Sequence, residues 1–227
     1  MKYLRYMCAA AIATGAIVPQ TIAQTPALQK GVSVQMAVTN NAIPMPEADK
    51  QDAWIIAVTA TGQVYFGTEA VSAEQLSQEM KSRPRNRNAE LYVKADARAP
   101  YASVKKTLEA AKEVMFDNAV LLTKQPEAPA LGMMVPPKGF DVSLTPALEA
   151  VVVQVSSSGQ KQPELKVNSS PVSVAGLQAA LNQALQNRKQ RRVVVKADPQ
   201  LPFADVVHII DAARSVGAET VLPAAEM

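Results

Sequence analysis

The sequence is poor in the residues that most metal sites, redox sites and hydrolases use. Its 227 residues include one cysteine, Cys8, and one histidine, His208. One cysteine cannot form an internal disulfide, and a lone histidine without neighbouring thiols or clustered acids makes a poor metal site. There is also no glycine-rich phosphate loop and no Gly-x-Ser-x-Gly elbow. We therefore expect no metal and no cofactor, and we place His208 on the surface of its helix.

The N-terminal segment lacks acidic residues and begins with the basic residues Lys2 and Arg5. Residues 6–18 form an apolar or small-residue run that is shorter than the roughly 20 residues of a membrane-spanning helix. Residues 21–23 (TIA) then place small side chains where a signal peptidase reads them. This pattern predicts a secretory signal peptide over residues 1–23 and a periplasmic protein. The alternative is an uncleaved inner-membrane anchor over residues 4–23.

Cleavage would leave a chain with little net charge. Removal of Lys2 and Arg5 lowers the formal net charge from +3 to +1, since two basic groups leave and no acid does. A chain so close to neutral gives no global case for nucleic-acid binding. About 200 residues remain, which suffices for two domains of roughly 70–90 residues each.

What the sequence does contain is an internal repeat. Residues 91–101 (LYVKADARAPY) return as residues 193–203 (VVVKADPQLPF), and the offset of 195 − 93 = 102 then holds without a gap. Each copy reads as a buried strand, a turn with aspartate and proline, and an amphipathic helix that starts on an aromatic ring, Tyr101 or Phe203. An internal repeat decides the fold before any other feature. We therefore predict two tandem copies of one small α/β domain.

The hydrophobic patterns extend each copy in both directions. A hairpin is predicted over residues 54–67 and again over residues 151–168, each with a glycine in the turn. Ser72 and Ser173 then read as N-caps of a first helix, Ser72 with Gln75 at the capping-box position. A leading strand is expected at residues 31–36 and at residues 139–144, which gives the order β-β-β-α-β-α-β.

This order predicts an α/β (α+β) protein in which each domain is a mixed sheet with two helices packed on it. Residues 24–52 read as a tether, and residues 53–124 as the first domain. Residues 125–138 are rich in proline and alanine and read as a semi-rigid linker. Residues 139–227 form the second domain.

The ordered motifs together resemble the periplasmic domain of the ExbD/TolR family of biopolymer transport proteins. The shared pattern is a glycine turn, a Val-Ser-x-x-x-Leu helix, a Val-Lys-Ala-Asp strand end and a proline followed by an aromatic ring. The first copy carries it at Gly62, Val64, Gly67, Val71, Ser72, Leu76, Val93, Ala95, Asp96, Pro100, Tyr101 and Leu108. The second carries it at Gly159, Val172, Ser173, Leu177, Val195, Ala197, Asp198, Pro202, Phe203 and Ile210. Asn168 stands where Gly67 does, so the second copy is the more diverged.

The resemblance implies a part in a machine driven by the proton-motive force. Family members carry a transmembrane aspartate followed by this periplasmic domain, which dimerises and engages a partner's extended peptide or the cell wall. Here no acidic residue precedes Glu47, so the apolar segment holds no carboxylate for an intramembrane proton relay. What the resemblance then implies is a non-catalytic binding or accessory protein. Its partner would be an envelope protein of a TonB/Tol-type energy-transduction complex, or the cell wall or an anionic membrane surface.

Asp96 and Asp198 are the repeated polar residues, and two interpretations remain open for them. Each could hold a ligand at the C-terminal end of its strand, which would suit a small periplasmic enzyme or ligand-binding protein. Alternatively, each could end its strand by accepting hydrogen bonds from its own turn amides. Nothing places a nucleophile beside either one, so we expect no enzyme.

Basic clusters follow the first helix of both copies. A like-charge cluster is often a solvated loop. Its recurrence in both copies, although the local sequence has drifted, suits binding to phospholipid heads or to cell-wall carboxylates and phosphates. The candidate residues are Lys81, Arg83, Arg85 and Arg87 in the first copy and Arg188, Lys189, Arg191 and Arg192 in the second.

Finally, the duplication predicts that the two copies pair within one chain. A leading strand such as residues 31–36 or residues 139–144 leaves an open edge, which tends to recruit another strand. Tethering raises the effective concentration of the two copies to about the millimolar range for a short linker.

Overall fold

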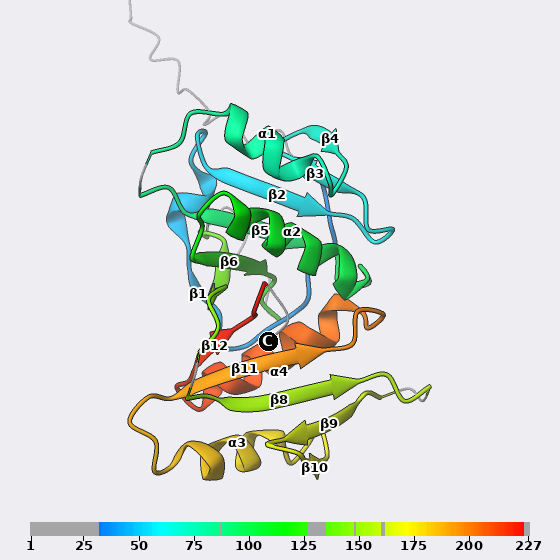
Figure 1. Ribbon diagram of the computed structural model, residues 1–227, viewed down its shortest axis with the longest axis vertical. Coiled ribbons are helices and arrows are strands. Elements are labelled where there is room, and N and C mark those ends of the chain that lie inside the picture. The colour runs from blue at the N-terminus through cyan, green and yellow to red at the C-terminus, as the bar shows by residue number, and fades with distance from the viewer. Residues whose placement is uncertain (1–31, 87, 127–134, 148, 160–161, 225–227) are drawn as a thin grey trace, which may run out of the picture.

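A computed structural model describes residues 32–86, 88–126, 135–147, 149–159 and 162–224 of the chain (Figure 1). The predicted signal peptide, Gly31, Arg87 and residues 127–134 of the predicted linker lie outside this range. Within it, no helix is both long and apolar enough to cross a membrane.

The first copy is a three-stranded meander, a helix, a parallel strand, a second helix and a last strand. A short strand and a 3₁₀ helix precede it, β1 (Ile43–Pro44) and η1 (Pro46–Asp49). The elements of the copy are β2 (Trp54–Val58), β3 (Val64–Phe66), β4 (Glu69–Val71), α1 (Leu76–Ser82), β5 (Leu91–Ala95), α2 (Tyr101–Glu113) and β6 (Asn118–Thr123).

The second copy repeats this order behind a leading strand of its own. Its elements are β7 (Lys138–Ser143), β8 (Val151–Ser156), β9 (Glu164–Val167), β10 (Ser170–Val172), α3 (Leu177–Leu185), β11 (Arg192–Ala197), α4 (Phe203–Ser215) and β12 (Glu219–Val221). The predicted α/β class is confirmed, and the second helices begin on Tyr101 and Phe203 as expected.

Local chemistry explains these elements and two differences from the expected order. Gly62 takes a φ of +83° in the β2–β3 turn, a conformation that glycine adopts without strain. Each hairpin continues into a third short strand, β4 or β10, which the sequence pattern did not predict. The first helix begins at Leu76 rather than directly after Ser72, because a turn intervenes in which the N–H of Gln75 donates to Ser72 Oγ over 3.2 Å.

All but one of the named strands lie in one continuous run across the sheet, in the order β10-β9-β8-β11-β12-β7-β6-β5-β2-β3-β4. On either side of β7 the two copies repeat the same pairings: β2 and β8 are parallel to β5 and β11 and antiparallel to β3 and β9. The copies therefore have the same strand order.

Strand β7 joins the two copies. It pairs antiparallel with the whole of β6, from Asn118 opposite Ser143 to Thr123 opposite Lys138, and parallel with β12. The second predicted leading strand thus exists, and its edges hold the last strands of both copies together. The short β1 pairs with the first two residues of β7.

The first predicted leading strand, residues 31–36, is wrong over its described part, because residues 32–36 form no strand. The physical reason is that β7 already occupies the edge of β6. Residues 32–42, here called the N-terminal strap, instead cross the molecule and make a single bridge between Val38 and Lys124. Met36 packs on the sheet against a small cluster that includes Tyr92, Val120 and Leu122.

The core is shared by both copies and lies between the sheet and the helices. One cluster of buried apolar residues includes Val104 and Leu108 from α2, Phe140 from β7 and Ile210 from α4. Figure 1 shows the helices of the first copy in front of their strands and α4 behind β11, because the sheet twists strongly between the copies.

A second contact joins the copies where α2 and α4 begin. The N–H of Tyr101 donates to the carbonyl of Leu201, and the N–H of Phe203 donates to that of Ala99, both over 2.8 Å. The next residue of each helix repeats the exchange, Ala102 with Pro199 and Ala204 with Ala97. Helix N-termini leave N–H groups without intrahelical partners, and here each copy supplies carbonyls to the other.

Candidate binding surfaces

Asp96 is a buried carboxylate with a full set of partners. Its side chain is 5% exposed and forms an ion pair with Arg98, Nε to Oδ1 at 2.8 Å. It also accepts the backbone N–H groups of Arg98 (3.1 Å) and of Gln35 in the N-terminal strap (3.0 Å). The hydrogen bonds from Arg98 hold the pKa of this carboxyl well below its usual range, although burial opposes them. Because the Asp96 carboxylate is fully engaged by Arg98 and Gln35, we infer that its role is to stabilise the turn.

Asp198 repeats only part of this arrangement. Its Oδ1 accepts the N–H of Gln200 over 2.9 Å, just as Asp96 accepts that of Arg98 two residues later. Both aspartates therefore form the turn that the structural interpretation of these residues predicted. Tyr101 and Phe203, the aromatic residues of the motif, are 3% and 1% exposed and belong to the core. The four motif residues lie beside the backbone contact between the copies.

The basic cluster of the first copy is largely engaged within the protein. Arg83 forms an ion pair with Glu69, Nη2 to Oε2 at 2.9 Å, and its guanidinium lies 4.1 Å from the Phe66 ring centre. Arg85 donates to the carbonyl of Val114 at the end of α2 over 3.0 Å. Lys81 is exposed, and Arg87 lies outside the described residues.

The cluster of the second copy follows the same plan. Arg191 donates to the carbonyl of Val216 at the end of α4 over 2.7 Å. Arg85 makes the equivalent contact at the end of α2 in the first copy. Arg192 forms an ion pair with Glu219, Nε to Oε2 at 3.0 Å. Arg188 and Lys189 are exposed and form no ion pair with any described residue. Cationic groups at a helix C-terminus also interact favourably with the helix dipole.

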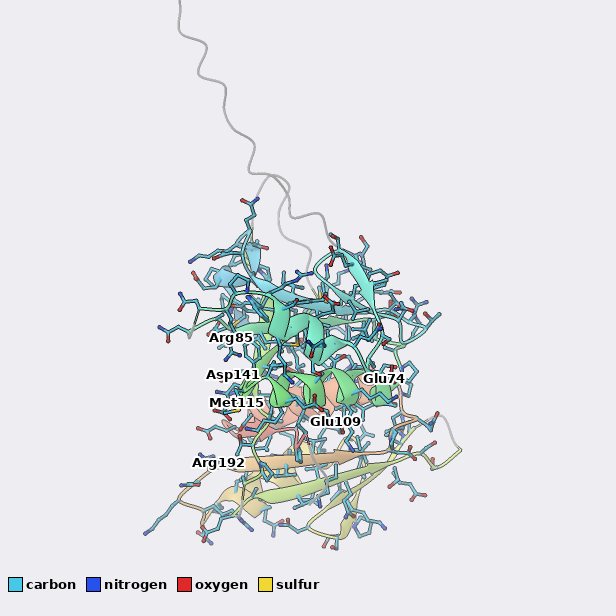
Figure 2. All side chains as sticks on the ribbon, turned by 45° about the horizontal axis from the view of Figure 1, so that its top comes forward. Glu74, Arg85, Glu109, Met115, Asp141 and Arg192 are labelled. Atoms are coloured by element: carbon cyan, nitrogen blue, oxygen red, sulfur yellow. The ribbon has the colours of Figure 1, made fainter. Side chains whose placement is uncertain are left out.

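The structure places both basic clusters on one side of the molecule. Figure 2 shows Arg85 and Arg192 on this side with Asp141 of β7 between them. Binding of an anionic surface stays a prediction, and within the described residues its free candidates are Lys81, Arg188 and Lys189.

The two end strands of the sheet differ at one equivalent position, where β4 has Ala70 and β10 has Pro171. Strands β4 and β10 are the end strands, and each pairs with a single described neighbour. Ala70 lies opposite Tyr65, and Pro171 lies opposite Lys166 at the equivalent place. Proline is tolerated on an edge strand where its missing N–H would face outward. The equivalence indicates that the N–H of Ala70 faces outward, so β4 offers a donor that β10 lacks.

Several residues of functional interest gave no signal in the sequence. Asp211 of α4 accepts the backbone N–H groups of Asn40 (3.2 Å) and Asn41 (2.8 Å) and so ties the N-terminal strap to the second copy. Asp141 and Arg214 meet at the junction of the copies, 73 residues apart in the chain. His208 is exposed, as expected. The described residues contain no cluster of histidine, cysteine or acidic side chains that could hold a metal ion.

Comparison with known protein families gives one result. The family model described as biopolymer transport protein ExbD/TolR matches the chain twice, over residues 18–126 and residues 120–224. The comparisons with curated proteins and with solved structures gave no match. The two matches correspond to the two structural copies.

Proposed function

The chain belongs to the biopolymer transport protein ExbD/TolR family, and from this we propose that it is a non-catalytic periplasmic accessory protein that binds an envelope partner. Family members are transport accessory proteins rather than enzymes and act in energy-transduction complexes with other envelope proteins. The partner proposed here is the periplasmic segment of a protein from a TonB/Tol-type complex. A binding role is proposed here over a motor role because the apolar run of residues 6–18 contains no acidic residue for a proton relay.

The observation that carries the proposal is the outward edge of β4. Strand addition to an open sheet edge is a common way to bind an extended peptide, because main-chain hydrogen bonds supply the affinity. The outward N–H of Ala70 is available for this, whereas Pro171 blocks the equivalent group of β10. The tandem protein would thus offer one peptide-binding edge rather than two.

Substitution of Ala70 by proline tests the proposal with a residue that the second copy already carries. The A70P variant should unfold like the parent protein and should lose binding to the partner segment, measured by fluorescence anisotropy with the full chain. A matched exposed variant, Thr68→Ala, should bind normally. Binding by A70P as tight as that of the parent would exclude β4 as the binding edge.

Identification of the partner uses a photo-crosslinking residue at position 70 in living cells. The expected adduct contains a TonB/Tol-type protein, and the same probe at Glu113, an exposed residue at the end of α2, should not form it. Adducts formed only with proteins outside the envelope would contradict the proposed function as a whole.

A second candidate function, binding of an anionic membrane or cell-wall surface, rests on the exposed cations of both copies. Lys81, Arg188 and Lys189 carry no ion pair with described residues, so they are the right positions for charge reversal. Reversal of Arg83, Arg85, Arg191 or Arg192 would instead break contacts inside the protein. The triple reversal should abolish salt-sensitive binding to anionic vesicles. Unchanged binding at low salt would leave these side chains as solvated loop residues.

A further inference from the structure

The two most exposed large apolar side chains of the described residues line the same groove. Met115, directly after α2, is 78% exposed, and Ile43 of β1 is 55% exposed. The groove, here called the Met115 groove, has a volume of about 500 Å³ and lies beside the first residues of β5 and β6, with Met45 in its lining. Exposed apolar side chains that gather in a hollow mark an interaction surface.

Met115 is held in a backbone conformation that a methionine disfavours. Its φ is +67°, and the equivalent residue of the second copy, with a φ of +70°, is Gly217. A residue other than glycine is strained in this left-handed region, and such strain collects at binding sites. The first copy therefore has a strained and solvent-exposed apolar side chain at a position where the second copy has glycine. This difference indicates that the Met115 side chain is used for binding.

The charged residues of the groove leave negative charge without a partner. The one cation of its lining, Arg85, donates to a carbonyl at the end of α2, and Asp117 forms an ion pair with Lys112. By contrast, the Asp141 carboxylate forms no ion pair and no hydrogen bond with a described residue. Glu90 accepts a single hydrogen bond from the described residues, which a tyrosine hydroxyl donates.

The carboxylates of Glu90 and Asp141 lie within electrostatic range of each other. Partial burial raises the pKa of Asp141, Arg214 lowers it, and the charge of Glu90 raises it again. A positive group beside the two carboxylates would relieve their repulsion. Both side chains are exposed, so a guest in the groove can reach them. Figure 2 shows Asp141 and Met115 on the same side of the molecule.

The Met115 groove continues past Glu90. Asn88, Ala89 and Glu90 also line a second hollow of about 380 Å³, whose lining extends to Trp54. An elongated groove of this kind suits an extended chain better than a compact small molecule. Side chains of an extended peptide point alternately to opposite sides, so residues two apart face the same way.

We propose that the Met115 groove binds an extended peptide with one apolar side chain between two basic ones, in the order Lys-x-apolar-x-Lys or its arginine equivalent. The apolar side chain packs on Met115 and Ile43, and the basic side chains pair with Glu90 and Asp141. Charge complementarity selects this occupant, because the groove offers carboxylates without partners and its own cation is already engaged.

Titration of the full chain with the peptide acetyl-Lys-Ser-Leu-Ser-Lys-amide tests the proposal. Calorimetry should show saturable binding that weakens as salt is added, because the contacts between charges are exposed. Two control peptides remove one feature each. Glu-Ser-Leu-Ser-Glu reverses the charges and Lys-Ser-Ser-Ser-Lys removes the apolar side chain, so each should bind at least about tenfold more weakly. No saturation at millimolar peptide, or equal affinity for all three peptides, would overturn the proposal.

Variants of the groove assign the contacts. Glu90→Gln and Asp141→Asn should each weaken binding of the lysine peptide about threefold to fivefold, the usual scale of an exposed ion pair. Met115→Gly should weaken it about tenfold, although this variant relieves the backbone strain. Met115→Gln keeps that strain and the length of the side chain and should weaken binding similarly. Glu164→Gln changes an exposed charge on β9 and is the matched control. Unchanged affinity in all four groove variants contradicts the proposal.

Sedimentation velocity of the parent protein distinguishes the peptide from a second copy of the chain. A monomer is expected at the concentration of the titration. A dimer that Met115→Gly converts to monomers would assign the groove to self-association and overturn the peptide assignment.

The inference goes beyond the proposed partner binding and does not depend on it. Ala70 lies on the end strand β4, so the A70P variant should bind the lysine peptide as the parent protein does. Loss of partner binding in A70P and loss of peptide binding in M115G are therefore separate outcomes.

Discussion

Asp96 and Asp198 end equivalent strands, yet the two carboxylates stand in different surroundings. Both accept the N–H two residues later, which is the contact that the duplicated turn itself provides. Asp96 alone is closed over by Arg98 and by Gln35 of the N-terminal strap. The second copy has Gln200 where the first has Arg98, and in the part of the chain that the structure describes no other segment donates a hydrogen bond to the Asp198 carboxylate. The two copies therefore share the hydrogen bond that forms the turn, but only the first has the contacts of Arg98 and Gln35 with the aspartate.

The leading segments of the two copies differ in the same way. The centre of the sheet has room for one strand between β6 and β12, and β7 occupies it. The corresponding segment of the first copy became the N-terminal strap, which is fastened by Asp96 at one end and by Asp211 at the other. Two like sequences therefore have unlike roles because they compete for a single position.

The largest effect is expected from Phe140→Ala in the shared strand. Phe140 is 1% exposed and lies opposite Leu121 of β6. Its removal should lower the free energy of unfolding by about 3–5 kcal/mol, the usual cost of such a cavity.

Hydrogen exchange shows whether β7 serves both copies. The F140A variant should accelerate amide exchange in β6 and in β12, whereas Phe66→Ala, a buried change in the first copy alone, should act mainly on β2 to β4. Acceleration by F140A confined to the second copy would contradict the shared role of β7.

The next effect compares Asp96→Ala with Asp198→Ala. Loss of Asp96 removes a buried carboxylate and leaves the N–H of Gln35 and the Arg98 side chain without their partner, so it should cost roughly 2–3 kcal/mol, against about 1 kcal/mol for Asp198. Urea unfolding at pH 7 measures both. Equal losses in the free energy of unfolding would mean that the contacts of Arg98 and Gln35 with Asp96 contribute nothing to stability.

The stabilisation by Asp96 should also depend on pH. Because Arg98 lowers the pKa of Asp96 in the folded protein, the stabilisation is present above the unfolded pKa of about 4 and is lost as the pH falls below it. The parent protein should therefore lose stability in this window, and Asp96→Ala should remove this part of the loss. Arg98 is 67% exposed, so salt screens part of the ion pair.

A smaller difference is expected between Arg85→Ala and Arg191→Ala. Both arginines bind the final carbonyl region of a second helix, and each loss should cost about 1 kcal/mol. Arg85 also lies 4.2 Å from the centre of the Phe116 ring, which adds roughly 0.5–1 kcal/mol in the first copy. Thermal unfolding at matched ionic strength checks the order, and a larger loss for Arg191 would reverse it.

The smallest effect is a gain in stability. Met115 has a φ of +67° after α2, whereas the equivalent residue after α4 is Gly217, with a φ of +70°. Met115→Gly should stabilise the protein by about 1 kcal/mol because glycine adopts this conformation without strain. Gly217→Met should cost a similar amount, and this reciprocal pair is measured by the same thermal unfolding.

The repeat explains why much of the fold could be predicted from the sequence. The strands that end at Ala95 and Ala197 and the helices after them carry strong local periodicity, and the structure has them where expected. Strands β4 and β10 were missed because three residues hold too little alternation to be read. The fate of residues 32–36 depended on a competitor more than a hundred residues away, which no local pattern records.

The binding residues were harder to predict for the same reason. A cluster of arginines gives a clear sequence signal, but the carbonyl partners of Arg85 and Arg191 lie 29 and 25 residues further along the chain. Likewise, Arg214 of α4 meets the backbone carbonyl of Asp141 in β7, 73 residues away in the chain, which no local pattern indicates.

Because β7 covers β6, the first sequence repeat ends before the strand that completes its part of the sheet. A gene fragment cut after the first repeat, at residue 126, would encode β6 with its entire outer edge bare, and bare edges promote aggregation. A fragment extended to residue 144 would carry the strand that covers it, although that strand belongs to the second repeat.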